Sequence, residues 1–110
     1  MDGTPISTVE QSLIEQQAIE ALRACYDPEI PVNIYELGLI YKVDVSDTGG
    51  VTVTMTLTSP HCPVAQSLPR EVEARLKTIP GVTGASVAVV WEPPWSPNLM
   101  SEAARLELGF

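Results

Sequence analysis

Cys62 is the residue whose type and position in this chain are best suited to chemistry. It stands in a turn at residues 58–63, after a strand-like pattern and before a helical one. A thiol in the first turn of a helix faces unpaired backbone N–H groups and the positive end of the helix dipole, and both favour the reactive thiolate. His61 is adjacent, but catalytic Cys–His pairs are generally brought together by the fold. The alternative for Cys62 is a small buried hydrophobic residue at a turn.

Other residues with chemical potential lie far from Cys62 in the sequence. Asp27, Glu29 and Glu36 form an acidic loop that could approach the cysteine turn, and the alternative is a solvated loop stabilised by caps and Asx turns. Trp95 stands among prolines, where an aromatic residue serves either as a lid over the core or as an exposed recognition residue. Both interpretations stay open for each of these residues.

Length and charge exclude several classes of function. With 110 residues, 45% of them hydrophobic, the chain fits a single domain over residues 1–110. A formal charge of -8 argues against nucleic acid and anionic membrane surfaces as partners. No apolar run is long enough to cross a bilayer, and residues 1–5 lack the features of a signal peptide. We expect a cytoplasmic protein whose two cysteines are reduced.

The first half of the sequence predicts a helix, a helical turn and a hairpin. Ser7 and Glu10 have capping-box spacing and begin a helix over about 8–25 that points Cys25 toward the core. Asn33 and Gly38 bracket a short helical turn at 34–37. Two alternating strands follow, at 39–45 and 51–58. The first strand is expected to place Leu39, Tyr41, Val43 and Val45 on one face and Ile40, Lys42 and Asp44 on the other, and the second a half-exposed row of four threonines at 52, 54, 56 and 58.

The second half completes an α+β fold. A helical stripe from Val64 to Ile79 passes through Pro69, which indicates either one kinked helix or a shorter helix capped by Ser67. A third strand at 85–91 is apolar on both faces and is expected to be internal or covered. We predict a two-layer sandwich: a small three-stranded mixed sheet, in helix-strand-strand-helix-strand order and covered by helices, with an extended C-terminal tail and a short helix at 101–108.

Several segments resemble a family of small iron-sulfur assembly proteins that includes SufT, PaaD and the eukaryotic cytosolic iron-sulfur targeting factors. The resemblance is carried by residues 26–41, by 58–63 with Cys62 at the family's reactive-cysteine position, and by 80–82, 93–95 and 100–101. It covers about 11–109. The chain resembles SufT most, since it ends without the cysteine-rich extension of PaaD-type members. His61 stands where many relatives carry a small residue, which makes an added imidazole ligand conceivable.

The resemblance implies a role in the maturation of iron-sulfur proteins. Our leading hypothesis is an accessory factor, not an enzyme, that acts as a homodimer and assists iron-sulfur cluster assembly or delivery to client apo-proteins. Cys62 would hold or transfer a transient iron-sulfur cluster or engage a client, with His61, Asp27 and Glu29 as secondary candidates and Trp95 as a partner-binding candidate. The chain has no Cys-x-x-Cys spacing, so a cluster would need two Cys62 thiolates across a dimer, a partner or a small thiol. The alternatives are a thiol hydrolase or transferase using Cys62 and His61, and a client-binding adaptor with no role for the cysteine.

Overall fold

The computed structural model describes residues 6–26, 32–57 and 67–109, and places two layers of secondary structure around one core. The candidate residues Asp27, Glu29, His61 and Cys62 lie outside these ranges. The elements follow in the order α1 (Thr8–Arg23), α2 (Ile34–Leu37), β1 (Ile40–Val45), β2 (Gly50–Met55), α3 (Ser67–Lys77), β3 (Gly84–Val89), the 3-10 helix η2 (Pro97–Leu99) and α4 (Glu102–Leu108).

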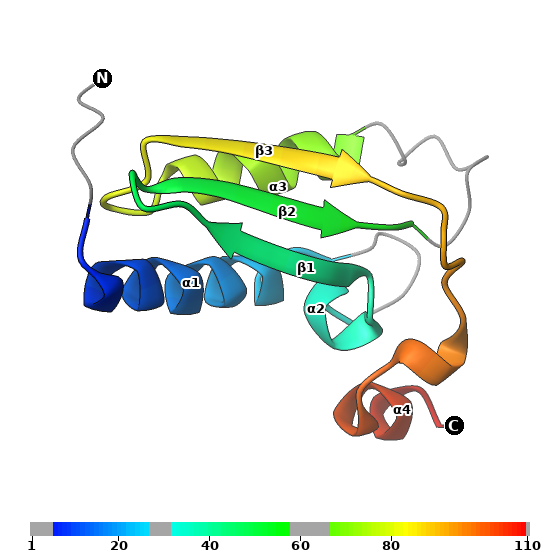
Figure 1. Ribbon diagram of the computed structural model, residues 1–110. Coiled ribbons are helices and arrows are strands. Elements are labelled where there is room, and N and C mark those ends of the chain that lie inside the picture. The colour runs from blue at the N-terminus through cyan, green and yellow to red at the C-terminus, as the bar shows by residue number, and fades with distance from the viewer. Residues whose placement is uncertain (1–5, 27–31, 58–66, 110) are drawn as a thin grey trace.

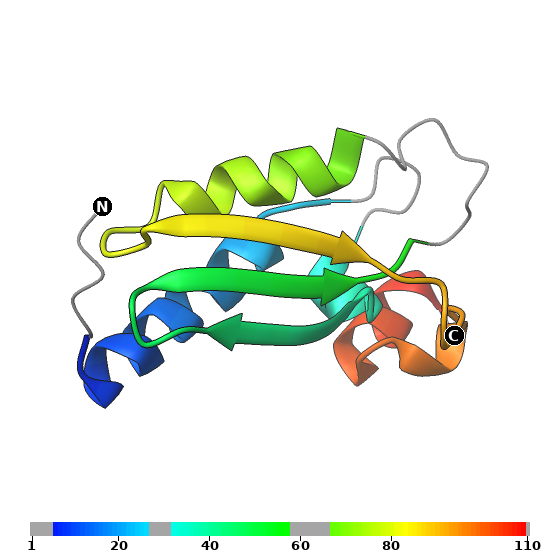
Figure 2. The ribbon, with the colours of Figure 1, turned by 45° about the horizontal axis from the view of Figure 1, so that its top comes forward.

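The sheet has three strands in the order β1-β2-β3, with β1 antiparallel and β3 parallel to the central strand β2. Figures 1 and 2 show α1 and α3 packed along one face of the sheet, while α2 and α4 lie near the end at which β2 and β3 finish. This arrangement confirms the predicted α+β two-layer fold with a mixed sheet. No helix in the described ranges has the length and apolar character needed to cross a membrane.

The core forms where the buried stripes of the two long helices meet the inner face of β2. The predicted capping box is present, because Ser7 Oγ accepts the Glu10 N–H and the Glu10 carboxylate reaches back to the Ser7 N–H. The prediction that Cys25 points into the core is also confirmed, since this residue is 0% exposed. The side chains that fill the centre of the core are Ile14, Ala18, Leu22, Val51, Val53, Met55, Leu68, Val72 and Leu76.

The predicted alternation along the first strand is wrong at its beginning, because β1 contains a bulge. Ile40 pairs with Met55, but the next paired residue, Lys42, faces Thr54, so Tyr41 is the extra residue. The bulge turns Ile40 toward the core, against which it packs. Tyr41 instead donates its hydroxyl to the Pro93 carbonyl at 2.7 Å. A periodic pattern cannot reveal such an insertion, because every residue around it fits a strand.

The predicted half-exposed row of threonines is correct for Thr52 and Thr54 and wrong for Thr56, which is 0% exposed. The Thr56 N–H donates to the Leu39 carbonyl at 2.8 Å. Its Oγ1 has no hydrogen-bond partner among the residues that the structure describes. The fourth threonine of the row, Thr58, lies outside those residues.

The third strand is an edge strand, so the expectation that it is internal is wrong. β3 pairs only with β2 within the described sheet, and Ser86 and Ala88 are exposed on its open face. The sequence misled here because alanine is apolar but small, and a solvent-exposed alanine costs little. The described part of α3 begins at Ser67, which places Pro69 in its first turn, where proline is tolerated.

The C-terminal segment folds back against α2, and Gly38 makes this close approach feasible. Gly38 ends α2 with a φ of +89°, and a Cβ atom built on it would lie 2.3 Å from the Leu99 carbonyl oxygen. Beyond this contact, Met100 is only 6% exposed, and Ser101 caps α4 by accepting the Ala104 N–H. Glycine is therefore required at position 38 both for its backbone conformation and for the space.

We predict that Gly38→Ala lowers the free energy of unfolding by at least about 2 kcal/mol more than Gly109→Ala does. Both glycines have positive φ, so each substitution carries the left-handed penalty, but a Cβ at Gly109 would meet nothing within 4 Å. The comparison isolates the collision with Leu99. Urea unfolding of the two variants measures the difference, and equal losses would show that the C-terminal segment does not lie against position 38.

We predict that Thr56→Val raises the free energy of unfolding by about 1 kcal/mol, because the change removes a buried hydroxyl and keeps the shape of the side chain. The exposed Thr52→Val is the control, expected to stay within about 0.5 kcal/mol of the wild type. Urea unfolding at unchanged m-value reports both effects. A loss of stability in Thr56→Val would mean that the hydroxyl has a partner in the native protein.

Candidate functional site

The ends of four elements gather at one end of the sheet. Figure 1 shows that α1 finishes, α2 begins, β2 finishes and α3 begins at this end. The sequence segment that contains Asp27 and Glu29 joins the first two of these ends, and the segment that contains His61 and Cys62 joins the other two. The described elements therefore bring the ends of both candidate segments to one region. The roles of these four residues stay predictions.

The residues on either side of positions 27–31 are held together by backbone pairing. Tyr26 and Asn33 form an isolated antiparallel bridge, and the Ile34 N–H donates to the Cys25 carbonyl at 2.9 Å. Val32 is buried with 6% of its surface exposed. The two described residues that pair here, Tyr26 and Asn33, thus hold the ends of the flanking ranges together.

Cys25 is buried in the core beside this bridge, and its thiol has low reactivity. Its Sγ–H donates to the Ala21 carbonyl at 3.5 Å. Burial raises the pKa of the Cys25 thiol; the positive charge of Arg75 opposes this rise and the negative charge of Glu71 adds to it. A buried, protonated thiol is a poor nucleophile and a poor metal ligand. Cys25 therefore acts as a core residue.

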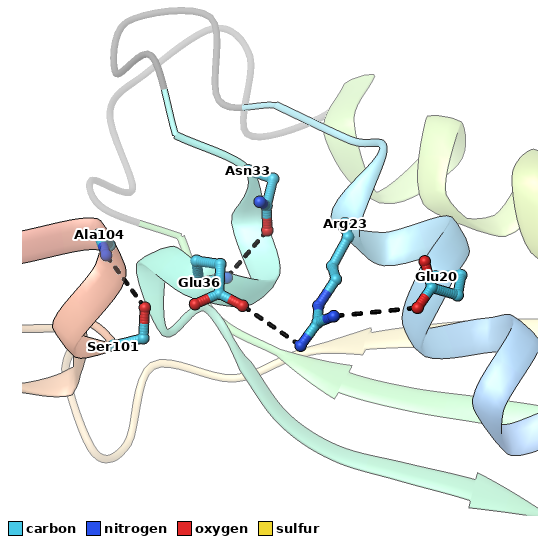
Figure 3. Close-up of polar contacts among 6 residues, drawn as sticks. All are labelled: Glu20, Arg23, Asn33, Glu36, Ser101 and Ala104. Carbon is cyan, nitrogen blue, oxygen red and sulfur yellow. Dashed lines mark hydrogen bonds and ion pairs between the residues drawn. The ribbon is translucent and has the colours of Figure 1, made fainter. Parts of the chain in front are cut away.

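Glu36, which the sequence grouped with the acidic loop, lies on α2 and has structural partners at the start of α2 and on α1. Its N–H donates to Asn33 Oδ1 at 2.9 Å, and its carboxylate lies 3.4 Å from Arg23. Arg23 also reaches Glu20 at 3.8 Å and stacks over the Tyr35 ring at 5.1 Å from its centroid. Figure 3 shows the Arg23 side chain between the two carboxylates. This network joins the end of α1 to α2, beside the bridge between Tyr26 and Asn33.

The C-terminal segment holds α2 from the other side. Trp95 is half-buried, packs against the core, and donates its indole N–H to the Leu37 carbonyl at 2.8 Å. The Ser101 N–H donates to the Glu36 carbonyl at 2.8 Å. Trp95 thus has the contacts of a lid over the core, and its partner-binding role stays a prediction.

A shallow hollow of about 170 Å³ opens between α2 and α4. It brings Glu36 and Glu107, which are far apart in sequence, to the same depression beside Tyr26. Sequence reasoning missed Glu107, because nothing in the spacing of residues 102–108 indicates that α4 packs onto α2. Within the described ranges, no three His, Cys, Asp or Glu side chains come close enough together to hold a metal ion. A site with three such ligands would therefore need at least one ligand from outside the described ranges.

Comparison with known proteins identifies the family. A family model described as iron-sulfur cluster assembly protein matches residues 15–89. A Porphyromonas gingivalis protein named Fe-S protein maturation auxiliary factor is 51% identical over 96 residues, which cover 87% of this chain and 91% of that relative. Fe-S protein maturation auxiliary factor SufT of Staphylococcus aureus is 45% identical over 83 residues, 76% of this chain and 94% of the relative.

A solved structure agrees with these matches. The crystal structure of a domain of unknown function, DUF59, from Bacillus anthracis superposes with a TM-score of 0.86 at 38% identity, covering 94% of this chain and 99% of that one. The predicted resemblance to SufT-like proteins is thereby confirmed, as is the fold. The chain belongs to the iron-sulfur cluster assembly protein family.

Proposed function

We propose that this protein is an accessory factor in the maturation of iron-sulfur proteins, acting through Cys62 in cluster assembly or delivery to clients. Family membership over residues 15–89 supports the general role, and relatives named as maturation auxiliary factors support an auxiliary, non-enzymatic one. Its partners would be the assembly machinery and client apo-proteins.

The burial of Cys25 is the observation that carries the assignment of the working thiol. The chain has two cysteines, and Cys25 is 0% exposed and bonded to a helix carbonyl. Any chemistry that needs an accessible sulfur of this chain therefore falls to Cys62. The sequence places Cys62 between the end of β2 and the start of α3, and the carboxyl end of a strand before a helix is a common position for functional residues.

A cluster carried by this protein would be cargo with incomplete ligation from one chain. Cys62 supplies one thiolate, and a cluster commonly takes four cysteine ligands. His61, Asp27 and Glu29 are the secondary candidates within the chain. The remaining ligands would come from a second copy, a partner protein or a small thiol. Incomplete ligation suits transfer, because a weakly held cluster is easily passed on.

We predict that iodoacetamide at neutral pH modifies Cys62 well before Cys25. Cys25 reacts only after local opening, since its sulfur is buried and its thiol has a raised pKa. Peptide mass spectrometry over a time course gives the two rates. In denaturant the rates should converge, which serves as the control. Equal rates in the native protein would contradict an accessible, activated thiol at position 62.

We predict that anaerobic reconstitution with iron and sulfide gives visible cluster absorption in the wild type and loses it in Cys62→Ser. Cys25→Ala is the matched control, because it removes the other sulfur and should leave the absorption unchanged. Native mass spectrometry gives the metal content and the number of chains for each variant. A cluster of equal amount in wild type and Cys62→Ser would exclude Cys62 as an essential ligand.

A further inference from the structure

The outer edge of β3 is an unprotected strand edge. Residues 84–90 contain no charged residue and no proline, the devices that commonly protect edges. The Val90 N–H donates to the Met55 carbonyl at 2.8 Å, and alternate residues of a parallel strand bond to the same neighbour. The backbone groups of Ser86 and Ala88 therefore face β2, and those of Ala85, Val87 and Val89 point to the outer edge, where no strand lies among the described residues.

The other edge of the sheet, β1, is protected in three ways. A bulge at Tyr41 interrupts its regular pairing, and Lys42 and Asp44 place charges on its exposed face. The Gln11 side chain donates to the Val45 carbonyl at 3.2 Å, which occupies an outward-pointing acceptor. The two edges of the sheet thus differ, and among the described strands only β3 has an edge open to another strand.

The distribution of charge along the chain indicates which kind of strand can approach the β3 edge. The segment 67–91, which contains α3 and β3, holds three basic and two acidic side chains, whereas the rest of the chain holds three basic and twelve acidic ones. A second copy of such an acidic chain is repelled by most of the surface. It meets a nearly neutral surface only along α3 and β3.

We propose that β3 pairs in antiparallel orientation with β3 of a second copy, about a two-fold axis through Val87. In this register Val87 meets its counterpart, Ala85 meets Val89, and Ser86 meets Ala88. All outward-pointing amide groups of Ala85, Val87 and Val89 then find partners, because these residues form the hydrogen-bonded pairs of the new ladder. The contact is isologous and closes on itself, and the protected β1 edges stop further growth.

The pairing also covers apolar surface. Ala85, Val87 and Val89 face the core but remain only partly buried, because nothing in the described structure flanks them on the outer side. In the joint six-stranded sheet they become internal. This inference stands independently of the role of Cys62, since it rests on the strand edge and on the charge distribution alone.

The proposed pairing also fixes how the two copies are oriented. Antiparallel strands run in opposite directions, so the ends at which β2 finishes and α3 begins lie at opposite ends of the joint sheet.

A charge-reversal series tests both the interface and its register. Ser86→Lys with Ala88→Lys puts like charges opposite each other twice across the two-fold axis, and Ser86→Lys with Ala88→Glu puts opposite charges there twice. Both positions are exposed, so the monomer should keep its fold. We expect a wild-type dimer in sedimentation equilibrium, a dissociation constant raised about tenfold or more by the Lys/Lys pair, and dimerisation retained with the Lys/Glu pair.

Asp44→Lys is the matched control, because it changes the net charge by the same amount as the Lys/Lys variant but on the β1 edge. It should leave the dissociation constant unchanged. Circular dichroism confirms that each variant is folded. A monomeric wild type, a Lys/Lys variant that dimerises as strongly as the wild type, or an equal weakening by Asp44→Lys would each overturn the proposal. Loss of the dimer with unchanged cluster binding would leave the role of Cys62 standing.

Discussion

The central position of β2 is the constraint on which the rest of the molecule depends. β2 is paired on both sides, and its inner side chains Val51, Val53 and Met55 are at most 2% exposed. Its register with β3 runs without interruption from Gly50 opposite Gly84 to Met55 opposite Val89. A one-residue slip would turn these side chains out of the core, so the register is strongly specified. The position at which β2 ends is therefore fixed by core packing.

The short helix α2 shows how the second half of the chain completes the first. Four residues form a helix only with outside support, because helix nucleation is unfavourable. Asn33 and Gly38 cap the two ends, and the C-terminal segment adds bonds from Trp95 and Ser101 to α2 carbonyls. The short helix α2 is therefore completed by tertiary contacts from the C-terminal segment.

Sequence reasoning succeeded where a local signal decides the structure. The capping box at Ser7, the turn between Asn33 and Gly38, and the alternation of β2 each depend on neighbouring residues, and the structure confirms all three. It failed where tertiary contacts decide. The burial of Thr56 and the edge position of β3 follow from what packs nearby in space, which spacing does not encode.

The same distinction between local signals and tertiary contacts applies to the residues of the candidate site. The burial of Cys25 was predictable, because this residue continues the apolar stripe of the helix predicted over about 8–25, although α1 itself ends at Arg23. The pairing of Glu36 with Arg23 was not, since the partners belong to different helices and neither spacing nor composition links them. The hollow between α2 and α4 was missed for the same reason.

The buried thiol of Cys25 is a probe of local opening in the native protein. The sulfur is buried just after the end of α1, next to the backbone bridge between Tyr26 and Asn33, and a reagent reaches it only when these parts separate. In excess reagent the modification rate divided by the rate of a free thiol gives the fraction of time spent open, and hence a local opening free energy. A molecule that binds the native protein at this end of the sheet and opposes this opening would lower the modification rate of Cys25, so this sulfur measures such binding without an added label.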